Sequence, residues 1–384
     1  MKDILDHVVL LVVALVVKFV FMIYKVFVWV VLPVTLVLIG WLLYRGSCSF
    51  WWGAVVLALV LVAVYQLYHY ADAWLPPSVG AGKWWDRLGD KFVAWIGTVK
   101  FFTSPFCMVE DPGSYRIKGA DIRALLDGQK EPVNPEAKLP LQPGDILLRG
   151  YDGYVDGELI RRTGGVQGSG KYFSHAALYV GALGEQDREI VARRLQVSDG
   201  KGGYRPATEA EKDKVRNDPA YFQTGPQMLI HSMSKGVFVE DILTFVRCDY
   251  LIVLRLPDVI KLGEPELKNK PLLELAEEAL KIDSDLVQGM HHDRKDIVAA
   301  ARRSALGRIG SAYDFQFDNS TTFHRFSCSG FVYYCYKSVQ RYIGVEPKKH
   351  SFAGLFSRIT VSPTDIYDAA ARQGKLEIVW TNVP

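Results

Sequence analysis

The sequence predicts an α+β domain, with strands and helices segregated along the chain, that follows an N-terminal transmembrane helical hairpin. Apolar runs of membrane-spanning length lie within the first 70 residues, and about 20 residues are enough to cross a bilayer. From residue 141 onward, short apolar stretches between Gly and Pro turns come first, and longer stretches with helical spacing follow. A run of strands followed by a run of helices is typical of the α+β class.

The membrane region is expected at residues 1–80. Two spans are predicted at about 26–44 and 51–70, where charged side chains are almost absent. The short polar stretch 45–49 joins them, so the two spans form a hairpin. The sequence therefore predicts an integral membrane protein whose first partner is the lipid bilayer.

A further apolar segment, 7–24, precedes the first span and is separated from it by Lys25 alone. It is long enough for a third span, but there is no room for a turn. An extension of the first helix and an interfacial segment are the other two interpretations. A secretory signal peptide is disfavoured, because its apolar region is shorter and is followed by a small-residue cleavage site.

An amphipathic helix and a linker are expected at residues 81–140. Within 82–102, Trp85 and Trp95 belong to an apolar stripe at helical spacing, with lysines at the polar positions. Tryptophan and lysine favour the headgroup region of a membrane, although a helix packed on the soluble domain has a similar stripe. The proline-rich segment 103–140 is interpreted as a linker.

The remaining domain is expected at residues 141–384. Strands are predicted at 145–149, 176–180, 228–231, 237–240 and 250–256. Helices are predicted at 267–282, 294–306 and 329–342, and from Ser362 to about residue 373. The hydrophilic stretch 184–225 is interpreted as an insertion, either a solvated excursion or a lid over a substrate.

Composition argues against several function classes. The net charge of +3 is small, and no basic run is interleaved with stacking aromatics, so a nucleic-acid partner is not expected. The five cysteines lack the spacing of a disulfide framework or of a zinc site. Reduced thiols are predicted, with no metal and no organic cofactor.

Cys328 is the candidate nucleophile. It stands just before an aromatic-rich predicted helix in the stretch 326–336. A helix N-terminus carries a partial positive charge and free N–H groups, so a thiol placed there is expected to be stabilised as the thiolate. The same N–H groups can hold an oxyanion. A lone cysteine is usually a buried small hydrophobe, which is the interpretation of Cys335 on the same helix.

His175 is the candidate base. It opens a predicted strand and shares one face with Ala177 and Tyr179. In the next strand Leu229 and His231 share a face, so His231 is expected beside His175, where it would orient the imidazole through its second nitrogen. Cysteine, base and orienting group are the minimal set for thiol acyl transfer.

Four blocks of this domain resemble the NlpC-type cysteine hydrolases of the papain-like superfamily. They cover most of residues 141–370. The blocks are 141–148, 174–181, 230–237, and 310–313 taken together with 327–332. The histidine block precedes the cysteine block, which is similar to the circularly permuted YiiX-like branch.

The resemblance implies a permuted papain-like domain, with a small antiparallel sheet packed on helices. It also implies that Cys328 is the nucleophile and His175 the base. The permuted branch often has a glutamate at the position of His231, so the third role stays open. By resemblance Tyr313 lies near the nucleophile and donates its hydroxyl to the oxyanion, whereas its alternative role is that of a core aromatic.

The predicted activity is cleavage of an acyl bond in an amide, ester or thioester through an acyl-enzyme. The membrane anchor favours a lipid or lipidated substrate. The alternatives are a cell-wall peptide endopeptidase or amidase, an acyltransferase, and a catalytically silent binding module on the same fold. The intact Cys and His pair argues against the last.

The charge distribution predicts the sidedness of the domain. Lysines and arginines lie on both sides of the hairpin, whereas only Arg45 lies between its spans. The positive-inside rule then places both ends, and so the catalytic domain, in the cytoplasm of a cell whose inner membrane holds the anchor. A third span would reverse this relation and would allow a periplasmic domain.

Overall fold

The computed structural model describes residues 116–117, 120–121, 141–151, 157, 160–161, 172–199, 203–263, 277–314, 317, 323–352 and 356–383. All of these residues belong to one compact unit, Pro77–Pro384. The predicted membrane region lies outside the described residues, as do the amphipathic helix and most of the linker. Within the described ranges, no helix has the length and apolar character needed to cross a bilayer.

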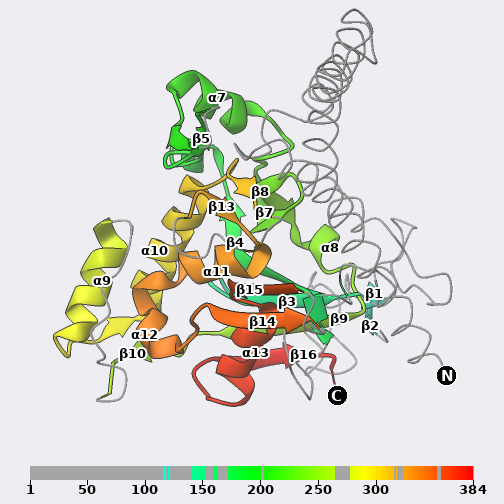
Figure 1. Ribbon diagram of the computed structural model, residues 1–384, viewed down its shortest axis with the longest axis vertical. Coiled ribbons are helices and arrows are strands. Elements are labelled where there is room, and N and C mark those ends of the chain that lie inside the picture. Colours follow the sequence, from blue (N-terminus) through cyan, green and yellow to red (C-terminus); the bar gives the residue numbers. More distant parts are fainter. Residues whose placement is uncertain are drawn as a thin grey trace, which may run out of the picture. The chain divides into compact units, whose positions relative to one another are not determined.

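A six-stranded antiparallel sheet forms the centre of the unit, with strand order β16-β9-β3-β4-β7-β8 (Figure 1). The strands are β3 (Ile146–Gly150), β4 (His175–Leu183), β7 (Gly225–Met233), β8 (Gly236–Asp241), β9 (Tyr250–Arg255) and β16 (Glu377–Thr381). The five strands expected from the sequence are present. β16 was not predicted, and it joins the sheet as an edge strand beside β9.

Each face of the sheet supports its own apolar core, because side chains of a strand alternate between the faces. Leu148, Ala176 and Ile230 belong to the larger core, which also contains residues of the long helices. Leu147 and Ala177 belong to a smaller core on the other face. The near-complete burial of both faces explains why these strands are apolar along most of their length.

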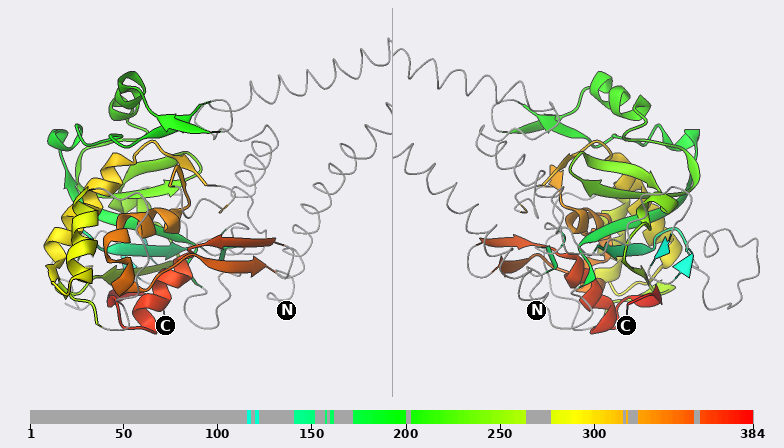
Figure 2. Two further views of the ribbon diagram at one scale, coloured as in Figure 1. Left: turned by 60° about the vertical axis from the view of Figure 1, so that its left-hand side comes forward. Right: turned by 90° about the vertical axis from the view of Figure 1, so that its right-hand side faces the viewer.

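Seven α-helices occur in the described residues, so the domain has the mixed α and β content that the sequence predicts (Figure 2). They are α7 (Glu209–Asn217), α8 (Ile242–Phe245), α9 (Glu277–Val287), α10 (Arg294–Gly307), α11 (Cys328–Cys335), α12 (Gln340–Ile343) and α13 (Pro363–Ala371). α11 and α10 pack on the face of the larger core, and α8 packs on the other.

The helix predicted at 329–342 is divided into α11, a 3-10 turn at Lys337–Val339, and α12. It ends where expected, at Gly344, which adopts a left-handed conformation with φ of 69°. The aromatic and β-branched residues that fill α11 have weak helix propensity, which fits the early change to a tighter turn.

The insertion contains regular structure. It holds a short 3-10 helix (Glu185–Asp187), the hairpin of β5 (Gln196–Ser198) and β6 (Tyr204–Pro206), and α7. The N–H groups of Ala192 and Arg194 donate to the last carbonyls of α10, at 3.1 and 2.9 Å. This contact attaches the insertion to α10.

In the described part of the chain, four further strand pairs lie outside the central sheet. They are β1 (Arg116–Ile117) with β2 (Ala120–Asp121), β10 (Val259–Ile260) with β11 (His292–Asp293), β12 (Ala312–Tyr313) with β13 (Arg325–Phe326), and β14 (Lys348–Phe352) with β15 (Phe356–Thr360). The β12 and β13 pair is parallel and leads directly into α11.

A buried ion pair joins β3 to β9. Asp145 is 1% exposed, and its two oxygens accept from Nε and Nη2 of Arg255, both at 2.7 Å. The N–H of Gln142 donates to the same carboxylate at 2.7 Å. Removing one member of such a pair leaves the other charge buried and uncompensated.

Asp145→Ala is therefore expected to lower the free energy of unfolding by about 3–5 kcal/mol. Urea unfolding of the protein in detergent, followed by circular dichroism, measures the change. The control is Arg205→Ala, which removes the exposed pair between Arg205 and Glu211 and should cost about 1 kcal/mol or less. Equal losses in the two variants would contradict the structural role of Asp145.

Candidate active site

Cys328 is the first residue of α11, as the sequence suggests. Ser327 caps the helix, since its hydroxyl accepts from the N–H of Gly330 at 3.1 Å. Ser329 is buried, and its hydroxyl donates to the carbonyl of Val361 at 2.6 Å. These two bonds fix the first turn, in which the N–H of Ser329 faces the thiol.

A second anchor holds the segment before Cys328 against β7. The buried hydroxyl of Ser232 donates to the carbonyl of Phe326 at 2.7 Å. Ser232 directly follows His231 in the chain, and Phe326 lies two residues before Cys328. The strand that carries His231 and the helix that carries Cys328 are therefore tied together near the candidate residues.

The thiol of Cys328 lies against the main chain where β4 begins. Its Sγ is 4.0 Å from the carbonyl oxygen of Ser174, and the N–H of Ala176 faces the sulfur. Ser174 and Ala176 are the residues on either side of His175. The structure thus brings the thiol next to the main chain at His175, although Cys328 and Ser174 are 154 residues apart in the sequence.

His175 and His231 are in direct contact. His175 Nε2 lies 2.7 Å from His231 Nδ1, and the two rings meet edge to face with centroids 5.0 Å apart. The register of the two strands accounts for this, because His231 pairs with Ala177, two residues beyond His175 on the same face. Phe245 of α8 packs against both rings.

The ring of His175 and the helix that carries the thiol lie on different faces of the sheet. The ring of His175 packs with Phe245 on the face of the smaller core, whereas α11 packs on the opposite face. Among the described residues no hydrogen bond joins Cys328 to His175, and Nδ1 of His175 has no hydrogen-bond partner. Since Nε2 of His175 faces His231, Nδ1 is the ring nitrogen that this contact leaves unengaged.

Burial sets the charge state of these groups. It lowers the pKa of both His175 and His231 well below the usual range, and the positive charge of Arg149 lowers them further. Burial raises the pKa of the Cys328 thiol, and the N–H groups of Ala176 and Ser329 only partly oppose this. A neutral thiol beside neutral imidazoles is the state that these shifts favour.

This charge state differs from the expectation that the helix N-terminus would stabilise a thiolate. Cys328 is only 2% exposed. A thiolate loses most of its hydration there. The free energy cost of this desolvation exceeds the stabilisation from the N–H groups that face the sulfur.

Two charged residues at the site, Arg149 and Glu240, were not predicted from the sequence. Arg149 is the cross-strand partner of His175, is 4% exposed, and donates from Nη1 to the carbonyl of Phe245 at 2.7 Å. Glu240 Oε2 lies 3.7 Å from Arg149 Nη1 and 3.4 Å from His231 Nε2. Each is a charged residue near the end of an otherwise apolar strand, and this position is the signal that could have identified them.

Tyr313 lies on β12, opposite Phe326 of β13 and thus close in the fold to the start of α11. Its ring contacts Phe317 edge to face at 6.2 Å between centroids. Both the oxyanion role and the core role remain predictions for this residue.

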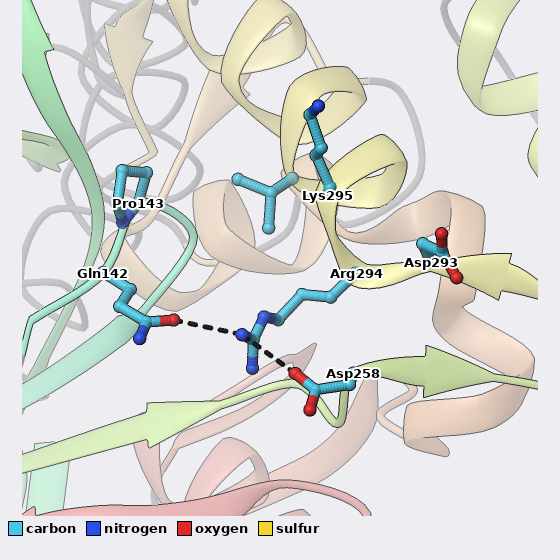
Figure 3. A pocket seen from close by; sticks show the side chains of 7 residues that line it. Gln142, Pro143, Asp258, Asp293, Arg294 and Lys295 are labelled. Carbon is cyan, nitrogen blue, oxygen red and sulfur yellow. Dashed lines mark hydrogen bonds and ion pairs between the residues drawn. The ribbon is translucent and has the colours of Figure 1, made fainter.

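A cavity lies away from these residues, at the start of α10 (Figure 3). It has a volume of about 430 Å³ and is lined by Gln142, Pro143, Asp258, Asp293, Arg294, Lys295 and Val298. Arg294 spans it, with Nη2 3.0 Å from Gln142 Oε1 and 2.9 Å from Asp258 Oδ1 (Figure 3). No candidate catalytic residue lines this cavity.

A search of the described residues for three or more His, Cys, Asp or Glu side chains that could hold a metal ion found no such group. Comparisons with protein-family models, with curated proteins and with solved structures each returned no match. The functional assignment therefore depends on the residues and the geometry described above.

Proposed function

We propose that the protein is a membrane-anchored cysteine hydrolase with a permuted papain-like domain, in which Cys328 attacks an acyl carbon and His175 is the base. The observation that carries the proposal is the position of the Cys328 thiol. It lies at the start of α11, against the main chain on either side of His175, whose ring is held by His231.

The proposed reaction begins from the neutral pair. The thiol turns from the Ser174 carbonyl toward His175, and Nδ1 takes its proton as the sulfur attacks the acyl carbon. Free N–H groups in the first turn of α11 stabilise the tetrahedral oxyanion. The leaving group takes the proton from His175, and water then attacks the acyl-enzyme while His175 again acts as the base.

The order of the elements supports the permuted form of the fold. β4, with His175, and β7, with His231, precede α11 in the chain, and α11 packs on β4. A plain papain-like domain has its cysteine helix before these strands, and a single exchange of segments relates the two orders. No cofactor is required by this chemistry.

We infer a lipid or lipidated acyl substrate from the apolar N-terminal segment and the tryptophan-rich stretch that follows it. A cell-wall peptide is the second candidate, because His231, rather than a glutamate, contacts the base, as the resemblance to the peptidases suggests. Labelling of Cys48 and of a C-terminal tag with a membrane-impermeant reagent tests the proposed cytoplasmic location of the domain.

Alkylation by iodoacetamide tests the proposed nucleophile. Cys328 should react faster than Cys248, whose pKa burial raises to about 12, and faster than Cys335, whose pKa burial raises further. Mass spectrometry of the folded protein measures the rate at each cysteine, and equal rates at Cys328 and Cys335 would remove the main support for the proposal.

The pH dependence of the same reaction tests the charge state. Because the pKa of Cys328 is raised, its thiolate fraction should increase about tenfold per pH unit from pH 7 to pH 9 and reach no plateau there. A preformed thiolate and imidazolium pair would instead give a rate that is already constant at neutral pH. Such a plateau would show that the neutral ground state is wrong.

A further inference from the structure

Two buried polar atoms beside the candidate site, His231 Nε2 and Glu240 Oε2, face each other. His231 Nε2 and Glu240 Oε2 are both closed to solvent, and neither makes a hydrogen bond of good geometry in the structure. They lie 3.4 Å apart. Burial of such atoms is costly unless they pair, and Glu240 Oε2 is an acceptor within reach of His231 Nε2.

We propose that Glu240 is a positioning residue that fixes the tautomers of His231 and His175, so that His175 presents an unprotonated Nδ1 to Cys328. This inference rests on the proposed function, in which Nδ1 of His175 receives the thiol proton. Glu240 acts through the two imidazoles and touches neither the substrate nor the thiol.

The carboxylate of Glu240 sets both tautomers, because it is the acceptor at one end of a chain that runs through His231 to His175. An ionised carboxylate only accepts hydrogen bonds, so His231 must carry its proton on Nε2, toward Glu240. Its Nδ1 is then an acceptor for the contact of 2.7 Å, and His175 must donate from Nε2. A neutral imidazole has one N–H, so Nδ1 of His175 is left unprotonated.

The opposite assignment would disable the base. If His231 carried its proton on Nδ1, it would donate to Nε2 of His175, and His175 would have to carry its own proton on Nδ1. A protonated Nδ1 cannot accept from the thiol. The contact between the two histidines is equally short in both cases, so it cannot by itself select the tautomer.

Burial gives Glu240 a raised pKa, and the neighbouring positive charges of Arg149 and Lys235 oppose part of this increase. Arg149 Nη1 lies 3.7 Å from the same oxygen that faces His231. Arg149 is itself held in place by the Phe245 carbonyl and by the Phe245 ring, whose centroid is 4.0 Å from its guanidinium carbon.

The register of the β7 and β8 hairpin places the carboxylate where it can serve this role. His231 pairs with Phe238, and Leu229 pairs with Glu240, so Glu240 is the diagonal neighbour of His231 on one face. Phe238 covers the ring of His231, with centroids 4.3 Å apart, and offers no acceptor. On this face of the hairpin, Glu240 thus offers His231 Nε2 an acceptor.

Imidazole ¹⁵N NMR of the full-length protein, labelled at histidine and held in detergent, tests the proposal directly. His231 and His175 should each show a protonated Nε2 and an unprotonated Nδ1, with signals assigned through single histidine substitutions. In Glu240→Gln the amide can donate as well as accept, so the signals of both histidines should shift toward the other tautomer. Unchanged tautomers in Glu240→Gln would overturn the proposal.

The matched control is Asp241→Asn, which removes the neighbouring carboxylate but keeps an oxygen that can cap α8 through the Leu243 N–H. It should leave both tautomers unchanged. Glu240→Asp keeps the charge and should restore the wild-type tautomers in part, whereas a purely structural role predicts no such rescue. A shift in Asp241→Asn as large as in Glu240→Gln would also overturn the proposal.

Alkylation separates this inference from the proposed function. Glu240→Gln should slow iodoacetamide labelling of Cys328 by about tenfold or more at pH 7.5, the range expected for losing a charge-assisted hydrogen bond. A reactive wild type with an equally reactive Glu240→Gln would contradict the role of Glu240 alone. An unreactive wild type would contradict the proposed function, and the ¹⁵N signals would still decide the tautomers.

Discussion

His175→Ala is expected to lower the rate of cleavage of a small soluble thioester by about 10²- to 10⁴-fold, the range that a positioned general base contributes. The thiol is buried and its pKa is raised, so without a base little thiolate forms at neutral pH. Cys328→Ala should remove the activity altogether. Single-turnover measurement of the acyl-enzyme separates loss of chemistry from loss of binding.

Cys335→Ala is the control for this series, because Cys335 is a buried thiol on the same helix that packs in the larger core. It should retain the activity of the wild type. If His175→Ala cleaved the thioester at the wild-type rate while remaining folded, the assignment of His175 as the base would be wrong.

Substitutions of His231 should have smaller effects, since His231 contacts the base and not the thiol. His231→Ala is expected to reduce turnover less than His175→Ala does. His231→Glu should retain some activity, because a carboxylate can orient His175. If His231→Ala turned over substrate at the wild-type rate, another residue would have to orient His175, and the assignment of Cys328 and His175 would be unaffected.

Removal of residues 1–80 is expected to lower activity on an acyl substrate embedded in vesicles by about 100-fold or more, because a shared membrane surface raises the effective concentration of enzyme and substrate. The described site lies wholly within Pro77–Pro384. Alkylation of Cys328 and cleavage of a soluble thioester should therefore change little in the truncated protein.

The comparison uses full-length and truncated protein on the same vesicles and the same soluble thioester. Parallel losses on both substrates would mean that the truncation damaged the domain. A truncated protein that cleaves cell-wall peptides well, with a full-length protein inert on every acylated lipid offered, would contradict the lipid substrate and favour the peptide.

The local pattern of the sequence was sufficient for the parts of the fold that depend on neighbouring residues. The alternation of side chains predicted the strands that became β3, β4, β7, β8 and β9, within a few residues at each end. The cap at Ser362 predicted the start of α13, and a reciprocal capping box forms there between Ser362 and Asp365. Such signals work because caps and periodicity act over a few residues.

The strands that were missed are an edge strand of the central sheet and a two-stranded hairpin. β16 is half-exposed, and only its pairing with β9, across more than 100 residues, makes it a strand of the central sheet. The hairpin of β14 and β15 was likewise not predicted. Strand pairing depends on distant partners, so local propensity says little about edge strands.

The sequence by itself determined that Cys328 begins a helix and that His175 and His231 lie on strands with a shared face, because helix starts and strand faces follow from local spacing. Only the tertiary structure decided that Glu240 and Arg149 lie beside the imidazoles, since those contacts require four strands in register. It also decided that the thiol is neutral rather than ionised. A pKa depends on how much water the fold removes from a group, and that quantity is set by all the elements packed around it.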